Sequence, residues 1–356
     1  LNQVDSVLAN KLFELIKASG RYAFNLSHSI KYAHVAYKTA WFKANHPLEF
    51  FTVYLSYAQE KMDKWEEIND LVNDCKYFGI EVLPPSINSR NANFSIEDGK
   101  IRYGLHHIKF GPSAKLMETI TNMPAIDHWR KLVIFLTTKL YGECPRSNTA
   151  EALIVTGAFD NLHISRKTLL SFYKFLQKLT DKEVDRLIDN INDCPSFGEF
   201  SEWFVVNMIP LTNKRRAETV LSHLSFFTDE PSPPAWIAEQ EKHFLGAFLT
   251  LSEVDGKMTK ATSVCNDCGG DFPERTQKVL AVVIDKVMPT VTKRGKNPGQ
   301  KMARINVRDS SGVLENLPVF PQDFLLLEPM LVEKNTVELT VESNANGWIV
   351  KTMSQL

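Results

Sequence analysis

The chain has 356 residues, of which 44% are hydrophobic and 23% charged, and its formal net charge is −1. This composition is typical of a globular protein of two or three domains, and it excludes a chain that is disordered throughout. The sequence contains neither an apolar run long enough for a membrane span nor the pattern of a signal peptide. Its five cysteines are an odd and sparse set, which favours free thiols in a reducing cytoplasm over a disulfide framework. Because the sequence begins with Leu1 rather than Met, we expect a part of a longer protein.

The first part of the chain is predicted to be helical. Apolar residues recur at helical spacing over residues 5–18 and, more clearly, over residues 28–44. Ser27 is a candidate N-cap of the second helix, and Pro47 is expected to stop it. A third, highly charged helical stretch is predicted over roughly residues 48–77.

Proline residues then interrupt the helical pattern. Pro84 and Pro85 cannot continue a helix, and we place a domain boundary just after them, at residue 88. Residues 94–104 are predicted to form a short hairpin with Asp98-Gly99 as its turn. Four further helices are predicted at about residues 112–122, 126–140, 147–156 and 165–180.

The last third of the chain changes in charge and in periodicity. Residues 181–202 carry a net charge of −5, most simply as a solvated face, and residues 231–234 form a stiff proline linker. After about residue 275 the hydrophobic period changes from 3.6 to 2 residues. Five short strands, which suggest a small barrel, are predicted at residues 278–287, 301–309, 315–320, 336–342 and 347–351.

Common catalytic motifs are absent from the sequence. No phosphate-binding loop, dinucleotide-binding fingerprint, zinc-protease motif or nucleophile elbow occurs, and no Asp-x-Asp pair is present to hold two magnesium ions. Cys265 and Cys268 form one C-x-x-C pair without a second pair. A surface loop with two free thiols is therefore the favoured interpretation, and a zinc site is the alternative.

The residues before the second predicted helix are a candidate nucleotide or phosphate site. Polar and aromatic residues crowd residues 21–28, directly before the helix start, where free N–H groups favour anions. His28 and Tyr32 are four residues apart and share one face, with Lys31 beside them. A capped helix with an isolated histidine remains the alternative.

Residues 278–308 carry a net charge of +7 and are a candidate surface for single-stranded nucleic acid. Arg304, Asn306 and Arg308 alternate with apolar residues and so share one strand face, and the loop at residues 292–296 adds charge. The alternative is a solvated β-ribbon. Two glycine turns, at residues 107–112 and 155–160, are candidate phosphate contacts, although a glycine after a helix is usually its C-cap.

Taken together and in order, these segments resemble the C-terminal part of the alpha subunit of bacterial DNA polymerase III, the C-family replicative polymerases. Residues 22–50 are similar to the fingers signature of that family, although Leu26 stands where the family usually has lysine. In the first glycine turn, Pro112 removes a backbone N–H. The resemblance continues at Cys75, Gly79, residues 82–88, 103–109, 157–160, 241–249 and 292–295, and at the D-x-S-G of residues 309–312.

The resemblance implies a multidomain, mainly helical protein followed by a small β-barrel of the OB type. Residues 1–88 would end the fingers domain, 89–221 would form a tandem helix-hairpin-helix domain that grips duplex DNA, 222–236 would be a linker, and 237–356 a connecting helix and the OB domain. The incoming nucleotide would contact Tyr22, Asn25, Ser27, His28 and Tyr32. DNA would contact Lys109, Gly111, Gly157, Arg166, Lys167, Lys293, Arg294, Lys296, Arg304 and Arg308.

The resemblance also implies partners. A clamp-binding peptide is expected at His223, Leu224, Ser225, Phe226 and Phe227, where a helix end with apolar residues is the alternative. Primer-template DNA, its single-stranded template, a deoxynucleoside triphosphate and the rest of the polymerase chain complete the expected partners. The catalytic carboxylates, with their magnesium, are expected in a palm domain outside this chain, which would leave this part of a DNA-directed DNA polymerase, a nucleotidyltransferase, inactive alone. The alternative is a stand-alone or degenerate DNA-binding accessory protein with the same modules.

Overall fold

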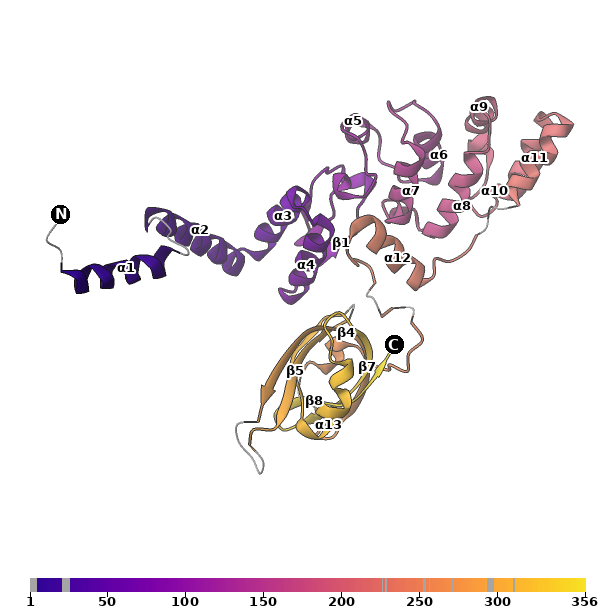
Figure 1. The fold of residues 1–356 in the computed structure, drawn as a ribbon. Helices are drawn as coiled ribbons and strands as arrows, with labels where there is room; N and C mark the ends of the chain where they lie inside the picture. The colour runs from indigo at the N-terminus through magenta and orange to yellow at the C-terminus, as the bar shows by residue number, and fades with distance from the viewer. Residues whose placement is uncertain are drawn as a thin grey trace. The chain divides into compact units, whose positions relative to one another are not determined.

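The computed structural model describes residues 5–20, 26–225, 227, 229–251, 254–255, 257–270, 272–292, 298–309 and 311–356, with only the backbone of residues 18–20 (Figure 1). The chain divides into two compact units, Leu1–Phe51 and Thr52–Leu356. Of the predicted site residues, Tyr22, Asn25, Phe226, Lys293, Arg294 and Lys296 lie outside the described residues.

The first unit consists of helices. α1 spans Ser6–Gly20 and α2 spans Leu26–Asn45, which confirms both predicted helices. Ser27 does not cap α2, because the helix already includes Leu26 and Ser27 lies within its first turn. Pro47 is the first residue of the next helix, α3 (Pro47–Tyr57), where its missing N–H leaves no hydrogen bond unmade.

The second unit opens with the end of α3 and with α4 (Lys64–Tyr77), separated by a short 3₁₀ turn at Ala58–Glu60. The single helical stretch predicted over residues 48–77 is therefore two helices. A three-stranded sheet follows, in the order β1-β3-β2, with β1 at Val82–Leu83, β2 at Ser95–Glu97 and β3 at Lys100–Arg102. The predicted turn of the β2–β3 hairpin is confirmed, since Asp98 and Gly99 have φ values of 51° and 76°.

Eight helices continue the unit. The four predicted ones are confirmed as α5 (Ala114–Asn122), α6 (Trp129–Thr137), α7 (Ser147–Val155) and α8 (Arg166–Leu176). They are followed by α9 (Asp181–Asn190), α10 (Phe200–Asn207), α11 (Lys214–Leu224) and α12 (Pro234–Leu245). In α9 the acidic residues Asp181, Asp185 and Asp189 are exposed and Val184 and Leu187 are buried, which confirms a solvated acidic face over this helix.

Aromatic side chains form the core that joins these helices. Phe172 of α8 lies with its ring centroid 4.9 Å from that of Phe200 of α10, and Trp129 of α6 packs on both rings. Phe175 and Phe204 extend the same cluster. Edge-to-face contacts of this kind stabilise a core beyond the area that they bury.

The C-terminal part is a five-stranded antiparallel sheet, and all five predicted strands are confirmed. The strands are β4 (Gln277–Val291), β5 (Lys301–Arg308), β6 (Val313–Val319), β7 (Thr336–Asn344) and β8 (Gly347–Gln355), with helix α13 (Pro321–Leu327) between β6 and β7. Their order is β6-β5-β4-β7-β8, so that the central strand β4 pairs with both β5 and β7. This is an OB-like arrangement in which strand pairing among the described residues leaves β6 and β8 as edges, so the barrel is not closed.

Within the described part of the chain, no helix is both long enough and apolar enough to cross a bilayer.

A buried histidine lies near the start of the helical domain. His107 is 2% exposed, and its ring lies 4.7 Å from that of Phe94 and 6.5 Å from that of Tyr103. The Tyr103 hydroxyl donates a 2.7 Å hydrogen bond to the carbonyl of Leu245, which ties this cluster to the end of α12. Burial lowers the pKa of His107 from 6.5 to about 4.

The lowered pKa predicts a pH-dependent stability. The unfolded histidine takes up a proton below pH 6.5 while the folded one stays neutral down to about pH 4, so stabilisation present above pH 6.5 is lost as the pH falls through this window. Between roughly pH 7 and pH 4.5, we expect the free energy of unfolding of the wild-type chain to fall by about 2 kcal/mol more than that of His107→Phe, as measured by urea denaturation. Equal losses in the two proteins would contradict this account of His107.

Candidate nucleic-acid interface

The second hairpin, between α7 and α8, is built around a buried arginine. Arg166 is 5% exposed and its guanidinium bonds Asp160 at 2.7 Å and Glu241, a fully buried carboxylate, at 3.1 Å. The other oxygen of Glu241 accepts from the backbone N–H groups of Leu249 and Thr250, each at 2.9 Å. The prediction that Arg166 contacts DNA is therefore wrong, because its charge is neutralised inside the protein, where it joins α8 to α12.

Gly157 is required by this arrangement rather than by a ligand. Its φ is +89°, and a Cβ at this position would lie 2.4 Å from Nη2 of Arg166 and 2.6 Å from Oδ2 of Asp160. Its N–H donates to Ile154 O at 3.2 Å, and the N–H of Ala158 donates to Leu153 O at 3.0 Å. This is a Schellman motif that ends α7, so the expected role of Gly157 in holding phosphate is replaced by the C-cap alternative.

The first hairpin also uses its backbone N–H groups internally. Lys109 N–H donates to Phe244 O and Gly111 N–H to Ile108 O, both at 2.8 Å. A Cβ on Gly111 would lie 2.5 Å from Leu105 O, too close for any side chain, so this position requires glycine. These two amides are thus not available to a phosphate. The side chain of Lys109 is half-buried, with its Nζ 3.2 Å from Nε2 of His243.

A pocket of about 500 Å³ lies beside the first hairpin, where the N-termini of α5 and α7 meet. Ser113 caps α5 by accepting a hydrogen bond from the N–H of Leu116 at 3.3 Å, and the exposed Lys115 and Arg146 stand at the two helix starts. Lys115 pairs with Glu143 at 2.6 Å. Two helix N-termini and two cations favour an anion at this place. Lys115 and Arg146 were missed from the sequence, where their signal is a basic residue at the first turn of each helix.

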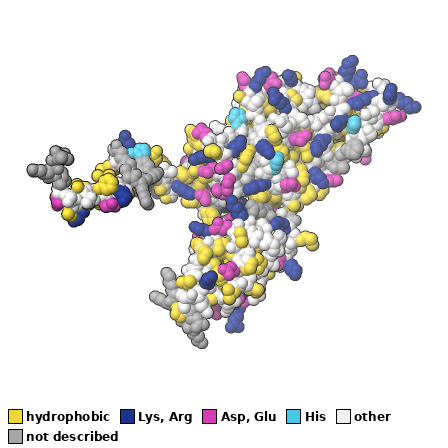
Figure 2. Space-filling view, viewed as in Figure 1, with side chains coloured by type: hydrophobic (Ala, Val, Ile, Leu, Met, Phe, Trp, Pro, Cys, Tyr) yellow, Lys and Arg dark blue, Asp and Glu magenta, His cyan; other side chains and the backbone are white. Residues whose placement is uncertain are grey.

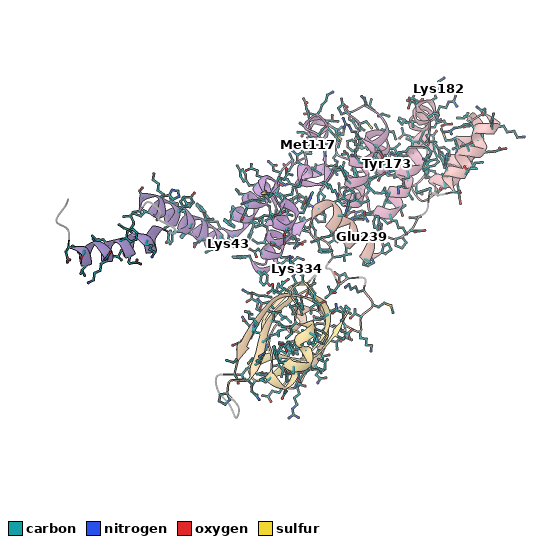
Figure 3. All side chains as sticks on the ribbon, viewed as in Figure 1. Lys43, Met117, Tyr173, Lys182, Glu239 and Lys334 are labelled. Atoms are coloured by element: carbon teal, nitrogen blue, oxygen red, sulfur yellow. The ribbon has the colours of Figure 1, made fainter. Side chains whose placement is uncertain are left out.

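The basic strand face of the C-terminal sheet is only partly available. Arg304 is exposed and Asn306 half-buried, but Arg308 is 3% exposed and donates from Nε to Asp285 at 2.6 Å. The hydroxyl of Tyr77, at the end of α4, donates to the same carboxylate at 2.9 Å. The prediction of DNA contact by Arg308 is wrong for the reason given for Arg166. Lys334, in the turn before β7 and labelled in Figure 3, pairs with Glu66 of α4 at 3.3 Å.

The two cysteines of the C-x-x-C pair are buried and not in a surface loop. Cys265 and Cys268 are free thiols, 1% and 5% exposed, that pack in the core of the sheet. Burial raises the pKa of Cys268 to about 11 and raises that of Cys265 further. Across the described residues, no group of three or more His, Cys, Asp or Glu side chains is placed to hold a metal ion.

Two described residues of the expected clamp-binding peptide, Leu224 and Phe227, pack on the helical core. Leu224 is 7% exposed, and the ring of Phe227 lies 5.5 Å from that of Phe172 and 5.8 Å from that of Phe197. Ser225 is exposed and His223 is half-buried. This packing contradicts the expectation that Leu224 and Phe227 project as anchors for a partner, and it supports the alternative of an apolar helix end.

Four further predicted residues lie on helices. The rings of His28 and Tyr32 are 4.3 Å apart on α2, which confirms their shared face, and Tyr32 is 65% exposed. Ser27 is exposed one residue before His28. Lys167, in the first turn of α8, pairs with Glu230 at 2.5 Å.

The crowding around Gly157 predicts a large cost for a methyl group. Gly157→Ala has to adopt a positive φ and displace the Arg166–Asp160 pair, so we expect a loss of more than about 2 kcal/mol in the free energy of unfolding, measured by urea denaturation. Gly99→Ala is the matched control, because Gly99 has a φ of +76° with no atom within 4 Å of its Cβ position, and it should lose only about 1 kcal/mol. Similar losses would show that the ion pair tolerates the methyl group.

Comparison with known proteins identifies the relatives of this chain. Residues 79–169, which contain both hairpins, match a family model described as a helix-hairpin-helix motif. The chain is 36% identical to the DNA polymerase III subunit alpha of Aquifex aeolicus over 350 residues, which cover 96% of this chain and 26% of that protein.

Other bacteria have similar relatives. The identity is 29% over 320 residues to the DNA polymerase III subunit alpha of Vibrio cholerae, over 88% of this chain, and 27% over 359 residues to that of Deinococcus radiodurans, over 97%. The chain spans about 25% of the length of both proteins. The resemblance inferred from the sequence motifs is thus confirmed: the chain is a relative of the bacterial DNA polymerase III alpha subunit and corresponds to about a quarter of it.

Proposed function

We propose that this chain is the DNA-handling part of a replicative, DNA-directed DNA polymerase and that its helix-hairpin-helix segment grips the primer-template duplex. The observation that carries the proposal is the helix-hairpin-helix match at residues 79–169, inside a chain similar along most of its length to DNA polymerase III alpha subunits. A nucleotidyltransferase of this kind uses magnesium held by carboxylates. That chemistry would come from the rest of the polymerase.

The duplex contact proposed here relies on side-chain charge. Because the hairpin N–H groups of Lys109, Gly111 and Gly157 are bonded within the protein, phosphates would be held by cations at the helix starts instead. Lys115 and Arg146 are exposed at the shared pocket of α5 and α7, and the half-buried Lys109 belongs to the adjoining hairpin.

Duplex binding measured by fluorescence anisotropy tests this proposal. Replacing Lys115 and Arg146 together by alanine should weaken binding and reduce the slope of log affinity against log salt by about 1.8, because each lost phosphate contact contributes about 0.9. Lys182→Ala with Lys260→Ala is the charge-matched control, since both lysines are exposed and lie outside the pocket. An unchanged slope in the first double variant would refute this duplex contact.

A second module fits the single-stranded template. OB-like sheets bind oligonucleotides on the face of their second and third strands and on the adjoining loops. In this chain that face includes the exposed Arg304 on β5, whereas Arg308 is engaged by Asp285. The proposed template contact is therefore centred on Arg304 and the β4–β5 loop.

The helices of the first unit fit a site for the incoming nucleotide against the rest of the polymerase. Apolar side chains of α1 and α2 remain exposed, among them Leu12 at 49%, Trp41 at 45% and Phe42 at 51%, and α2 has no buried residue among those described. Exposed apolar surface of this extent marks an interaction site. The rest of the polymerase chain is the proposed partner of these helices.

His28 is the proposed nucleotide contact, with Tyr32 supporting its ring. In the complete polymerase, His28→Ala should raise the KM for deoxynucleoside triphosphates roughly tenfold, which corresponds to about 1.4 kcal/mol of lost binding. Primer-extension kinetics measure the effect, and a ribonucleotide series reports any change in sugar discrimination. Unchanged values in both assays would remove His28 from the site. If the source of this chain encoded no polymerase palm domain, either with this chain or as a separate subunit, the alternative of a DNA-binding accessory protein would be favoured instead.

A further inference from the structure

A second groove lies on the helical part, where residues of α8, α11 and α12 meet, and it reaches the first turn of α8. It has a volume of about 450 Å³ and is lined by residues of α8, by His223 of α11 and by Trp236 of α12. Its lining residues are distinct from those of the pocket beside the first hairpin. In Figure 3, Tyr173 and Glu239 mark α8 and α12.

Lysines form one rim of this groove. Lys167 and Lys174, seven residues apart, lie on one face of α8, and Lys178 lies in the turn that follows the helix. Lys174 and Lys178 are exposed, and among the described residues neither takes part in an ion pair, whereas Lys167 pairs with Glu230. None of the described residues that line the groove is acidic.

Apolar and aromatic side chains form the rest of the groove. Phe175 is 2% exposed and closes its floor, while Leu170 and Trp236 are half-buried and form its walls. His223 is also half-buried and adds a second ring. The groove is thus lined by cations on and just after α8 and by an indole and an imidazole from two other helices.

The basic character of this region extends beyond the groove. Dark-blue side chains gather at the end of the helical part that carries α9 and α11 (Figure 2). Lys214 and Arg215, in the first turn of α11, are exposed, and Arg216 donates to the backbone carbonyl of Lys178 at 2.7 Å. Because α9 also exposes Asp181, Asp185 and Asp189 at this end, the charge that favours an anion is that of the lysines lining the groove.

We propose that this groove binds a segment of single-stranded nucleic acid. Its phosphates would lie on Lys167, Lys174 and Lys178, and its bases would stack on Trp236 and His223. A row of cations beside aromatic rings is the combination that holds an unpaired strand, because every base offers a face for stacking while the backbone stays near the charges. The bases of duplex DNA are already paired and stacked on one another, so a duplex offers the rings no free base face. The proposal rests on the proposed function only in taking DNA as the partner, since the groove shares no residue with the proposed duplex contact.

The experiment measures binding of a labelled oligothymidine strand and of a labelled duplex by fluorescence anisotropy, using the full 356-residue chain. Trp236→Ala should weaken oligothymidine binding about tenfold through lost stacking and leave duplex binding unchanged. Lys174→Ala with Lys178→Ala should reduce the salt slope for the single strand by about 1.4, because each lost phosphate contact contributes about 0.7. Lys182→Ala with Lys260→Ala is the charge-matched control, and circular dichroism checks that each variant is folded.

The outcomes separate the possibilities. Loss confined to the single strand supports the proposal, whether or not the Lys115 and Arg146 variants affect the duplex. Equal loss for single strand and duplex would overturn it, because the lysines would then attract DNA in general. Unchanged DNA binding, with lost binding of a labelled polyglutamate peptide, would overturn it in favour of an acidic protein partner.

Discussion

The helical part of this protein depends on one buried ion pair. Arg166 and Glu241 are 5% and 0% exposed, and these two residues, on α8 and α12, are 75 positions apart in the sequence. Removing two charges from water costs several kcal/mol, and such a pair is tolerable only when the remaining polar atoms are hydrogen-bonded. Here Asp160, two backbone N–H groups and the Thr250 hydroxyl supply those bonds. Losing one partner would leave an uncompensated charge and cost about 3–5 kcal/mol.

The same pair explains several local features. Gly157 has no side chain because the guanidinium occupies the place of a Cβ, and α7 ends there in a left-handed turn. α12 is anchored at two places, by Glu241 and by the hydrogen bond from Tyr103 to Leu245 O. A hairpin that resembles a phosphate-binding turn in its letters is thus a joint between three helices. In the proposed duplex contact, its contribution would be to hold the exposed cations of the neighbouring helices in fixed positions.

Much of this fold could be predicted from hydrophobic periodicity and turn residues. The Asp98-Gly99 hairpin and the five C-terminal strands follow from local rules, because alternating apolar residues such as Ile305 and Val307 have only one face to bury. The division of residues 48–77 into two helices has no comparable signal. The candidate site is harder to predict from the sequence. Periodicity shows that Arg304 and Arg308 share a strand face, but it does not show that Asp285 and Tyr77 occupy the Arg308 end of that face. The burial of Arg166 likewise depends on its ion pair with Glu241. Because Glu241 is far from Arg166 in the sequence, no local sequence pattern predicts this contact.

The pairing of distant strands in the C-terminal sheet affects the order in which the parts of the protein fold during synthesis. Its central strand β4 pairs with β7 in a register that joins Gln277 to Glu342, so this ladder closes a loop of 65 residues. By contrast, the Schellman turn of α7 and the hydrogen bonds between Asp160 and Arg166 join residues that are only a few positions apart in the sequence. Local contacts form early and distant pairings late, because loop closure has to precede the gain from pairing. During synthesis from the N-terminus, the joint of α7 and α8 can therefore assemble while β4 still awaits its partner, and the apolar strand is exposed until β7 leaves the ribosome.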